Sequence, residues 1–297
     1  MLKISQKIFV FIVTTIVVVT LVACQQNTPT STSSGVTPST ISLPSDTPIP
    51  MAVTVNGEGI SKTEFDAELS RFMAAQTELG NTIPADQTNQ QVLDELIDQF
   101  LLKQGAEAAG FTVDDVLLQE RIDSLVTQLG NQDALTTWEQ NHGYSDESFR
   151  VSLRRQIAAA WMRDYIIAQV PTIADQVHVQ QILAYTQEAA QNAWDQLNAG
   201  TDFDTLAYEF DPITKGELGW FPRNYLPDIQ IEEAAFALQP GEYSQVIETI
   251  AGYSILKLIE KDGEHLLSPD ALLTLQTRAI QDWLGNQRAS SDIVIAP

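Results

Sequence analysis

The spacing of apolar residues changes near residue 170, and this change divides the folded part of the chain into two halves of different class. From Ala52 to about Ala168, apolar residues recur with the period of amphipathic helices. After Gln176, short β-branched runs alternate with helical segments, and Pro171 separates the two patterns. We therefore expect an α+β fold in which a helical domain precedes a smaller domain with an antiparallel sheet.

The first half contains several amphipathic segments and no obvious reactive group. Ser61 and Glu64 have the spacing of a capping box at the start of the first helix. We find no nucleophile–base pair, glycine-rich phosphate loop or metal-ligand cluster in this half, so its residues alone indicate an interaction or scaffold domain. The apolar positions that mark its helices are Phe65, Leu69, Phe72, Met73 and Leu79; Val92, Leu93, Leu96, Ile97, Phe100 and Leu101; Val116, Ile122, Leu125, Val126 and Leu129; Leu135 and Trp138; and Phe149, Leu153, Ile157, Trp161 and Tyr165.

The N-terminal residues 1–24 have the layout of a secretory signal. Lys3 and Lys7 precede an apolar run over residues 8–22. The motif LVAC then ends in Cys24 and resembles the bacterial lipobox, in which the cysteine becomes lipidated after cleavage. The alternative is a plain N-terminal membrane anchor, although the run is short for a span. We expect Cys24, the only cysteine, to carry lipid and no internal disulfide to form.

The next segment and the net charge limit the possible partners. Residues 25–50 are rich in Ser, Thr and Pro and nearly free of charge, so we expect a disordered tether. The formal net charge of the chain is −23, and losing Lys3 and Lys7 with the signal would make it two units more negative. This excess of negative charge argues against nucleic acid as a partner. It also disfavours docking of the folded body on anionic lipid, so membrane attachment would depend on the lipid anchor.

The second half has the element order of a small α+β domain. Helices are expected over residues 187–199 and 203–210, and in the turn at 232–238. Strands are expected over residues 177–184, 215–221, 243–249 and 252–260. A last helix is expected over residues 266–288, with Ser268 as N-cap and Pro269 at its first position. We expect this last helix to pack against the N-terminal helices.

Two stretches of the first half resemble a known family. VTVNGEGISKTEFDAEL, residues 53–69, and VLDELIDQFLLKQGAEAAGFTV, residues 92–113, look like the N-terminal domain of the SurA and PrsA class of bacterial extracytoplasmic foldases. The Val-Asn-Gly turn before a helix is physically suited to a short strand that reverses toward that helix. The resemblance implies that the helical domain cradles unfolded or extended segments of exported polypeptides.

The second half resembles the parvulin peptidyl-prolyl isomerase domain. The similarity lies in GELGWF…AAFALQPGEYSQVIETIAGYSILKL, residues 216–258, and in the strand at 177–184. Where the family has a His-Ile-Leu triplet this chain has Gln181-Ile182-Leu183, and where it has Gly-Tyr-His-Ile this chain has Ser254 in place of the histidine. Both active-site histidines of the family are therefore replaced.

The resemblance also implies the remaining residues of the site. Asp211 loosely matches the acidic position, and Thr249 matches a threonine beside the pocket. His178 lies on the opposite strand face from Gln181 and is expected to be an ordinary, partly exposed histidine. The apolar positions that would form or support a proline pocket are Leu218, Phe221, Leu226, Ile231 and Phe236.

The sequence thus predicts a lipid-anchored foldase of the bacterial cell envelope. Three hypotheses remain open: an active prolyl isomerase, a chaperone whose parvulin-like domain has lost most catalysis, and a surface lipoprotein with a structural or ligand-binding role. Expected partners are unfolded exported polypeptides and proline-containing segments, and neither cofactor nor metal is expected. The predicted boundaries are 1–24 signal, 25–50 linker, 51–172 helical domain, 176–262 parvulin-like domain and 266–288 C-terminal helix.

Overall fold

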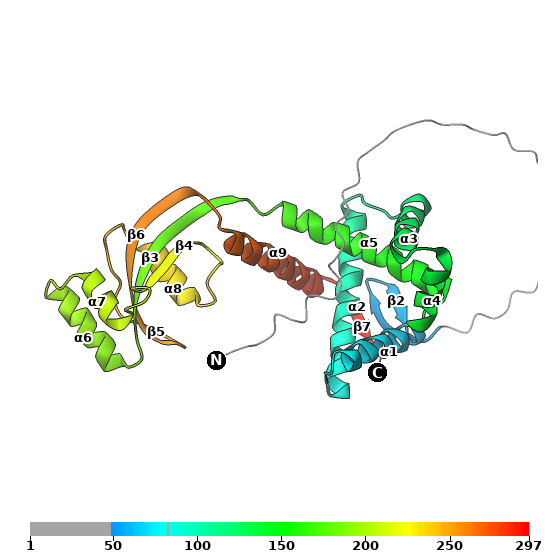
Figure 1. Cartoon of the computed structure of the whole chain (residues 1–297), viewed down its shortest axis with the longest axis horizontal. Coiled ribbons are helices and arrows are strands. Elements are labelled where there is room, and N and C mark those ends of the chain that lie inside the picture. Colours follow the sequence, from blue (N-terminus) through cyan, green and yellow to red (C-terminus); the bar gives the residue numbers. More distant parts are fainter. Residues whose placement is uncertain (1–48, 82, 297) are drawn as a thin grey trace, which may run out of the picture. The chain divides into compact units, whose positions relative to one another are not determined.

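The computed structural model describes residues 49–81 and 83–296, and Figure 1 shows the path of the chain. The predictions of a signal, of lipidated Cys24 and of nearly all of the linker lie outside the described residues. The helical elements of the first half are α1 (Lys62–Glu78), α2 (Ala85–Ala108), α3 (Asp115–Leu129), α4 (Gln132–Asn141) and α5 (Asp146–Ala168). The expected α+β fold is confirmed.

A short hairpin opens the helical part. It consists of β1 (Met51–Val55) and β2 (Glu58–Ser61), and its turn residues Asn56 and Gly57 adopt positive φ angles of 53° and 86°. Two-residue hairpins require such angles, which Asn and Gly adopt at low cost. The hairpin packs on α2 through a buried cluster that includes Val53, Ile60 and Leu96.

The start of α1 differs in one respect from the prediction. The Ser61 hydroxyl accepts a hydrogen bond from the Glu64 backbone N–H at 3.1 Å, as a cap should. The Glu64 carboxylate does not return to Ser61 to complete a capping box. It pairs with the guanidinium of Arg155 on α5 at 2.6 Å, and Arg155 is only 4% exposed. A buried cation needs a partner, and this need outweighs the second half of the cap.

The C-terminal segment completes the helical part. Helix α9 (Pro269–Ser290) packs on α5 and α2, and strand β7 (Ile293–Ile295) pairs with β1 to give a sheet of order β2-β1-β7. Arg288 of α9 contacts Asp98 at 2.7 Å and Asp94 at 3.1 Å, both on α2. The chain therefore begins and ends its described part in the same small sheet.

The α+β part is one four-stranded antiparallel sheet with helices on both faces. Its strands are β3 (Ile173–Ala184), β4 (Glu217–Pro222), β5 (Ile247–Thr249) and β6 (Gly252–Leu266), in the order β4-β3-β6-β5. Helix α8 (Ile229–Ala237) covers one face, and α6 (Gln187–Asn198) with α7 (Phe203–Phe210) covers the other (Figure 1). Each face has its own apolar cluster, so the sheet is buried on both sides near its middle.

No helix within the described residues is both long enough and apolar enough to cross a membrane.

Candidate functional site

The site is built on the sheet face that α8 covers, where β3 and β6 run side by side. Gln181 of β3 is in register with Leu256 of β6, and Leu183 is in register with Ser254. Paired residues of antiparallel strands point to the same face, so Gln181 and Ser254 lie on the α8 side. The Gln181 Nε2 donates a hydrogen bond to the Ser254 Oγ at 2.7 Å, and Ser254 has no exposed surface. The structure therefore brings together the two residues that were predicted to replace the family's histidines.

His178 lies on the other face of the sheet, as strand alternation predicts. Its Nε2 lies 2.6 Å from a carboxylate oxygen of Glu217, and its ring stacks on Trp220 with ring centres 5.4 Å apart. Trp220 in turn stacks on His265 at 4.1 Å. These contacts separate His178 from the Gln181–Ser254 pair and give it a structural environment of its own.

Four of the five predicted apolar residues share one cluster beneath α8. Phe221, Ile231 and Phe236 are buried in it, and the half-buried Leu226 packs against them. The rings of Phe221 and Phe236 meet edge to face, with centres 6.3 Å apart, and the Arg223 guanidinium lies 4.0 Å from the centre of the Phe236 ring. Nonpolar side chains thus form a buried cluster on the same sheet face as the polar pair.

Leu218 departs from this set. It occupies the irregularity where β4 shifts register against β3, between the pairs Val179–Gly219 and Gln180–Glu217. It is 36% exposed and belongs to none of the buried clusters of the described residues. An extra residue in a strand pair is pushed out of the ladder, and here Leu218 is that residue.

Glu232 is a residue of the site that sequence reasoning missed. Its carboxylate is buried, with the residue 2% exposed, and accepts hydrogen bonds from the backbone N–H groups of Asn224 at 2.7 Å, Tyr225 at 3.0 Å and Leu226 at 3.2 Å. Three such bonds from consecutive residues fix the loop between β4 and α8. Helical spacing could have identified Glu232, because it lies four positions before Phe236 and so shares the buried face of α8.

Asp211 is the C-cap residue after α7 and begins a tight loop. Its carboxylate accepts hydrogen bonds from the backbone N–H groups of Ile213 and Thr214 and from the Thr214 hydroxyl. The hydrogen bond from the Thr214 hydroxyl has the largest effect, and together with the backbone hydrogen bonds it holds the pKa of Asp211 below its usual range. No hydrogen bond among the described residues joins this carboxylate to Gln181 or Ser254.

The loop that follows Asp211 nevertheless touches β3 directly. The Gln181 backbone N–H donates to the Gly216 carbonyl at 2.7 Å, and the Gln180 side-chain amide donates to the Lys215 carbonyl at 2.8 Å. Gly216 has φ +71°, and a Cβ there would overlap the carbonyl oxygen of Gln181. The close approach requires glycine and fixes the loop against the strand that carries Gln181.

Thr249 is the last residue of β5, directly before the turn into β6. Its hydroxyl donates to the Gly252 carbonyl at 3.0 Å and accepts from the Ala251 N–H at 3.2 Å. The residue of β5 that pairs with Ser254 is Ile247, not Thr249. Thr249 therefore shapes the hairpin, and its hydroxyl is not hydrogen-bonded to the Gln181–Ser254 pair.

The Gln181–Ser254 pair offers hydrogen bonding in a water-poor setting. Gln181 and Ser254 can donate and accept hydrogen bonds, but neither exchanges a proton near neutral pH. Within the part of the chain that the structure describes, no group of three or more His, Cys, Asp or Glu side chains could hold a metal ion. The arrangement suits a reaction that makes and breaks no covalent bond.

Comparisons with known proteins agree with the two-part division. Residues 1–163 match the family described as SurA-like N-terminal domain, and residues 172–260 match the PPIC-type PPIASE domain. The chain is similar to "Chaperone SurA" of Alcanivorax borkumensis, with 26% identity over 250 residues that cover 70% of this chain and 56% of that protein. It is also similar to "Foldase protein PrsA" of Halalkalibacterium halodurans, with 24% identity over 268 residues, 81% of this chain and 75% of that protein.

A solved structure shows a similar extent of coverage. The peptidylprolyl isomerase PrsA of Bacillus cereus matches 84% of this chain and 94% of its own chain, with 21% identity and a TM-score of 0.47. The curated SurA relatives are longer than the region they share with this chain, which spans 56% of the Alcanivorax protein and 63% of a Vibrio vulnificus one.

Proposed function

The chain belongs to the family of SurA- and PrsA-like parvulin foldases, and on this basis we propose that it assists the folding of exported proteins as a lipid-anchored foldase. Its helical part would hold unfolded or extended segments, and its α+β part would act on their prolyl bonds. Lipid on Cys24 would keep the folded body at the extracytoplasmic side of a membrane. The observation that supports this most is the buried Gln181–Ser254 hydrogen bond beside the apolar cluster under α8.

Prolyl isomerisation requires little of the proton exchange that the two replaced histidines could have supplied. The reaction rotates an amide bond over a barrier of roughly 18–20 kcal/mol and forms no new covalent bond. A pocket lowers this barrier when it binds the twisted amide, with its reduced resonance, better than the planar one. The apolar cluster offers a water-poor surface for a proline ring, and the Gln181–Ser254 pair offers hydrogen bonds at its edge.

The second candidate function is a chaperone that binds segments without isomerising them. Two observations favour it: both histidines are replaced, and Phe221, Ile231 and Phe236 are at most 6% exposed. A proline ring could enter only if this cluster opened. A surface lipoprotein of unrelated role is disfavoured by membership of the family.

An isomerisation assay separates the first two functions. The full chain in mild detergent is tested on a short proline peptide, beside variants Gln181→His and Gln181→His/Ser254→His. The single variant is needed because Ser254 is fully buried and a histidine there strains the core. Gln128 and Ser124 form an exposed pair of the same kind on α3, with 3.5 Å between the amide nitrogen and the hydroxyl, so Gln128→His/Ser124→His is the matched control.

Each outcome of this assay decides between the two candidates. Acceleration by the native chain well above background supports the isomerase. Acceleration that appears only in a variant with histidine at Gln181 supports the chaperone with lost catalysis. The control variant should behave as the native chain does.

Client binding and anchoring need separate tests. If the helical part binds clients, removal of residues 176–262 should leave suppression of aggregation of a refolding protein intact, and loss of suppression would contradict that assignment. If Cys24 is lipidated, the bacterium should incorporate labelled fatty acid into the protein. The variant Cys24→Ala should remain unlabelled and leave the membrane fraction on mild washing.

A further inference from the structure

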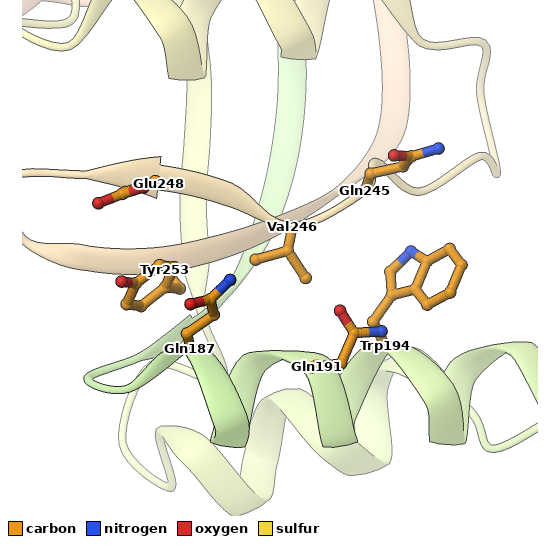
Figure 2. A pocket seen from close by; sticks show the side chains of 7 residues that line it. All are labelled: Gln187, Gln191, Trp194, Gln245, Val246, Glu248 and Tyr253. Atoms are coloured by element: carbon orange, nitrogen blue, oxygen red, sulfur yellow. The ribbon is translucent and has the colours of Figure 1, made fainter.

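A hollow lies on the sheet face opposite the Gln181–Ser254 pair. It has a volume of about 270 Å³ and lies between α6 and the hairpin of β5 and β6 (Figure 2). Tyr253 contributes to it, and because Tyr253 immediately precedes Ser254 in β6 the two side chains point to opposite faces. The hollow is therefore separate from the apolar cluster under α8. Its lining includes Gln187, Gln191, Trp194, Val246, Glu248 and Tyr253.

The strand beside this hollow has a free edge. β5 is the last strand in the order β4-β3-β6-β5, and within the described residues it pairs only with β6. Backbone N–H and C=O groups along the outer side of an edge strand can pair with an added extended segment. A segment added here would run along β5 with alternate side chains turned toward α6.

The side chains around the hollow fit a polypeptide backbone. Gln187, Gln191 and Gln245 line it, and each glutamine amide carries both a donor and an acceptor, which is the pairing that a peptide group needs. Figure 2 shows these amides around Val246, with Trp194 at one end of the group. The glutamines offer polar contacts to a backbone, and the indole and valine offer an apolar surface to one side chain.

The charge of the site selects among such segments. Glu248 is the only ionisable carboxylate in the lining, is exposed, and has no Lys, Arg or His within ion-pair distance among the described residues. A cationic side chain of a bound segment would supply its missing partner, and the negative net charge of the chain would favour approach of such a segment.

We propose that the hollow and the outer edge of β5 form a second polypeptide site, which binds an extended segment carrying a lysine or arginine. The proposal rests on the proposed function in that the ligand is unfolded polypeptide. It adds a site that requires no proline, on the face of the domain opposite the proposed proline pocket.

A proline-free peptide tests the site without engaging the proline pocket. The probe is a fluorescein-labelled octapeptide of alternating threonine and valine with one central lysine, and its binding to the full chain in mild detergent is followed by fluorescence anisotropy. The variant Glu248→Lys should weaken binding about threefold to tenfold at low salt, since a surface charge pair is reversed. Glu209→Lys, a charge reversal at another exposed glutamate, on α7, is the matched control and should bind as the native chain does.

Two changes to the probe test the mode of binding. Replacing its lysine by glutamate should weaken binding to the native chain and restore binding to Glu248→Lys. Methylating alternate backbone nitrogens along one edge should abolish binding, because those nitrogens can no longer donate to β5.

The inference is overturned if the probe does not bind at millimolar concentration, or if Glu248→Lys and Glu209→Lys bind it equally. Prolyl isomerisation and suppression of aggregation are measured on the same samples. If either activity persists while the probe fails to bind, this inference fails and the proposed function stands. If the probe binds with the expected charge dependence and both activities are absent, the proposed function fails instead.

Discussion

Changing the Glu232 carboxylate to an amide tests whether one buried side chain holds the loop that carries Leu226. One carboxylate oxygen accepts from the Asn224 N–H at 2.7 Å, and the other accepts from the N–H groups of Tyr225 and Leu226 at 3.0 and 3.2 Å. In Glu232→Gln one of these oxygen positions becomes an NH₂ group, which cannot accept. At least one backbone N–H then loses its acceptor, and the other bonds no longer go to a charge.

The geometry gives a lower bound on the effect. A hydrogen bond to a charged group contributes about 1.5–3 kcal/mol, and a neutral one about 0.5–1.5 kcal/mol. One lost bond and two weakened bonds should lower the free energy of opening this loop by at least about 2 kcal/mol. Because 1.4 kcal/mol corresponds to a tenfold change in an equilibrium constant, the amides of the loop should exchange about thirtyfold faster.

Amide hydrogen exchange measured residue by residue is the suitable assay, because it reports on local opening. Glu233→Gln is the matched control: it makes the same charge change at the next position, where the side chain is exposed. The amides of Asn224, Tyr225 and Leu226 should lose protection in Glu232→Gln and retain it in Glu233→Gln. Equal exchange rates in the two variants would refute the assignment of Glu232 as the anchor of the loop.

Three further predictions concern Gly216, Arg288 and the pH dependence of isomerisation. Gly216→Ala should lower the free energy of unfolding of the α+β part, measured in urea, by about 2–5 kcal/mol, because the new Cβ overlaps the Gln181 carbonyl. The control is Gly241→Ala: Gly241 has φ +90° and open space around it, so this variant measures the cost of the positive φ alone. Arg288→Ala should lower the free energy of unfolding of the helical part, measured by thermal unfolding, by about 1–2 kcal/mol, because it removes the ion pairs with two aspartates on α2. Lys62→Ala removes one exposed ion pair and should change this free energy by less than about 0.5 kcal/mol. The rate of prolyl isomerisation, where it is measurable, should be flat between pH 6 and 8, and a clear step there would contradict the assignment of the site.

The pKa of Asp211 supports the flat profile. Its folded pKa lies below the usual aspartate value because of the bonds to Thr214 and Ile213. A group with a lowered folded pKa contributes stability that is fully present above its unfolded pKa and is lost as pH falls through the folded pKa. Asp211 is therefore ionised throughout the neutral range, and its titration affects the loop only in acid.

Apolar periodicity predicted the interiors of the elements better than their ends. The helices over residues 187–199 and 203–210 agree with α6 and α7 closely. β6 was expected to end at Glu260 but continues to Leu266 through the polar stretch KDGEHL, because it pairs there with the early part of β3. Backbone pairing sustains this extension, and hydropathy carries no information about it. The three-residue β7 was missed for the same reason.

The candidate site shows a similar limit. Strand parity was sufficient to put Gln181 and His178 on opposite faces, and the structure agrees. Parity could not say how polar side chains use their hydrogen bonds. Asp211 and Thr249 bind backbone groups of their own turns, as Asp and Thr often do. Such local bonds are decided by turn geometry, which residue identity alone does not fix.

A cluster of two histidines and one tryptophan lies on the sheet face opposite the Gln181–Ser254 pair. His178 and His265 both stack on Trp220, and each contacts its own carboxylate, Glu217 at 2.6 Å and Asp262 at 3.2 Å. These contacts stabilise this end of the sheet, and none of them involves Gln181 or Ser254. His178→Gln, which removes the stacking on Trp220, should therefore lower the free energy of unfolding of the α+β part and leave the rate of prolyl isomerisation unchanged.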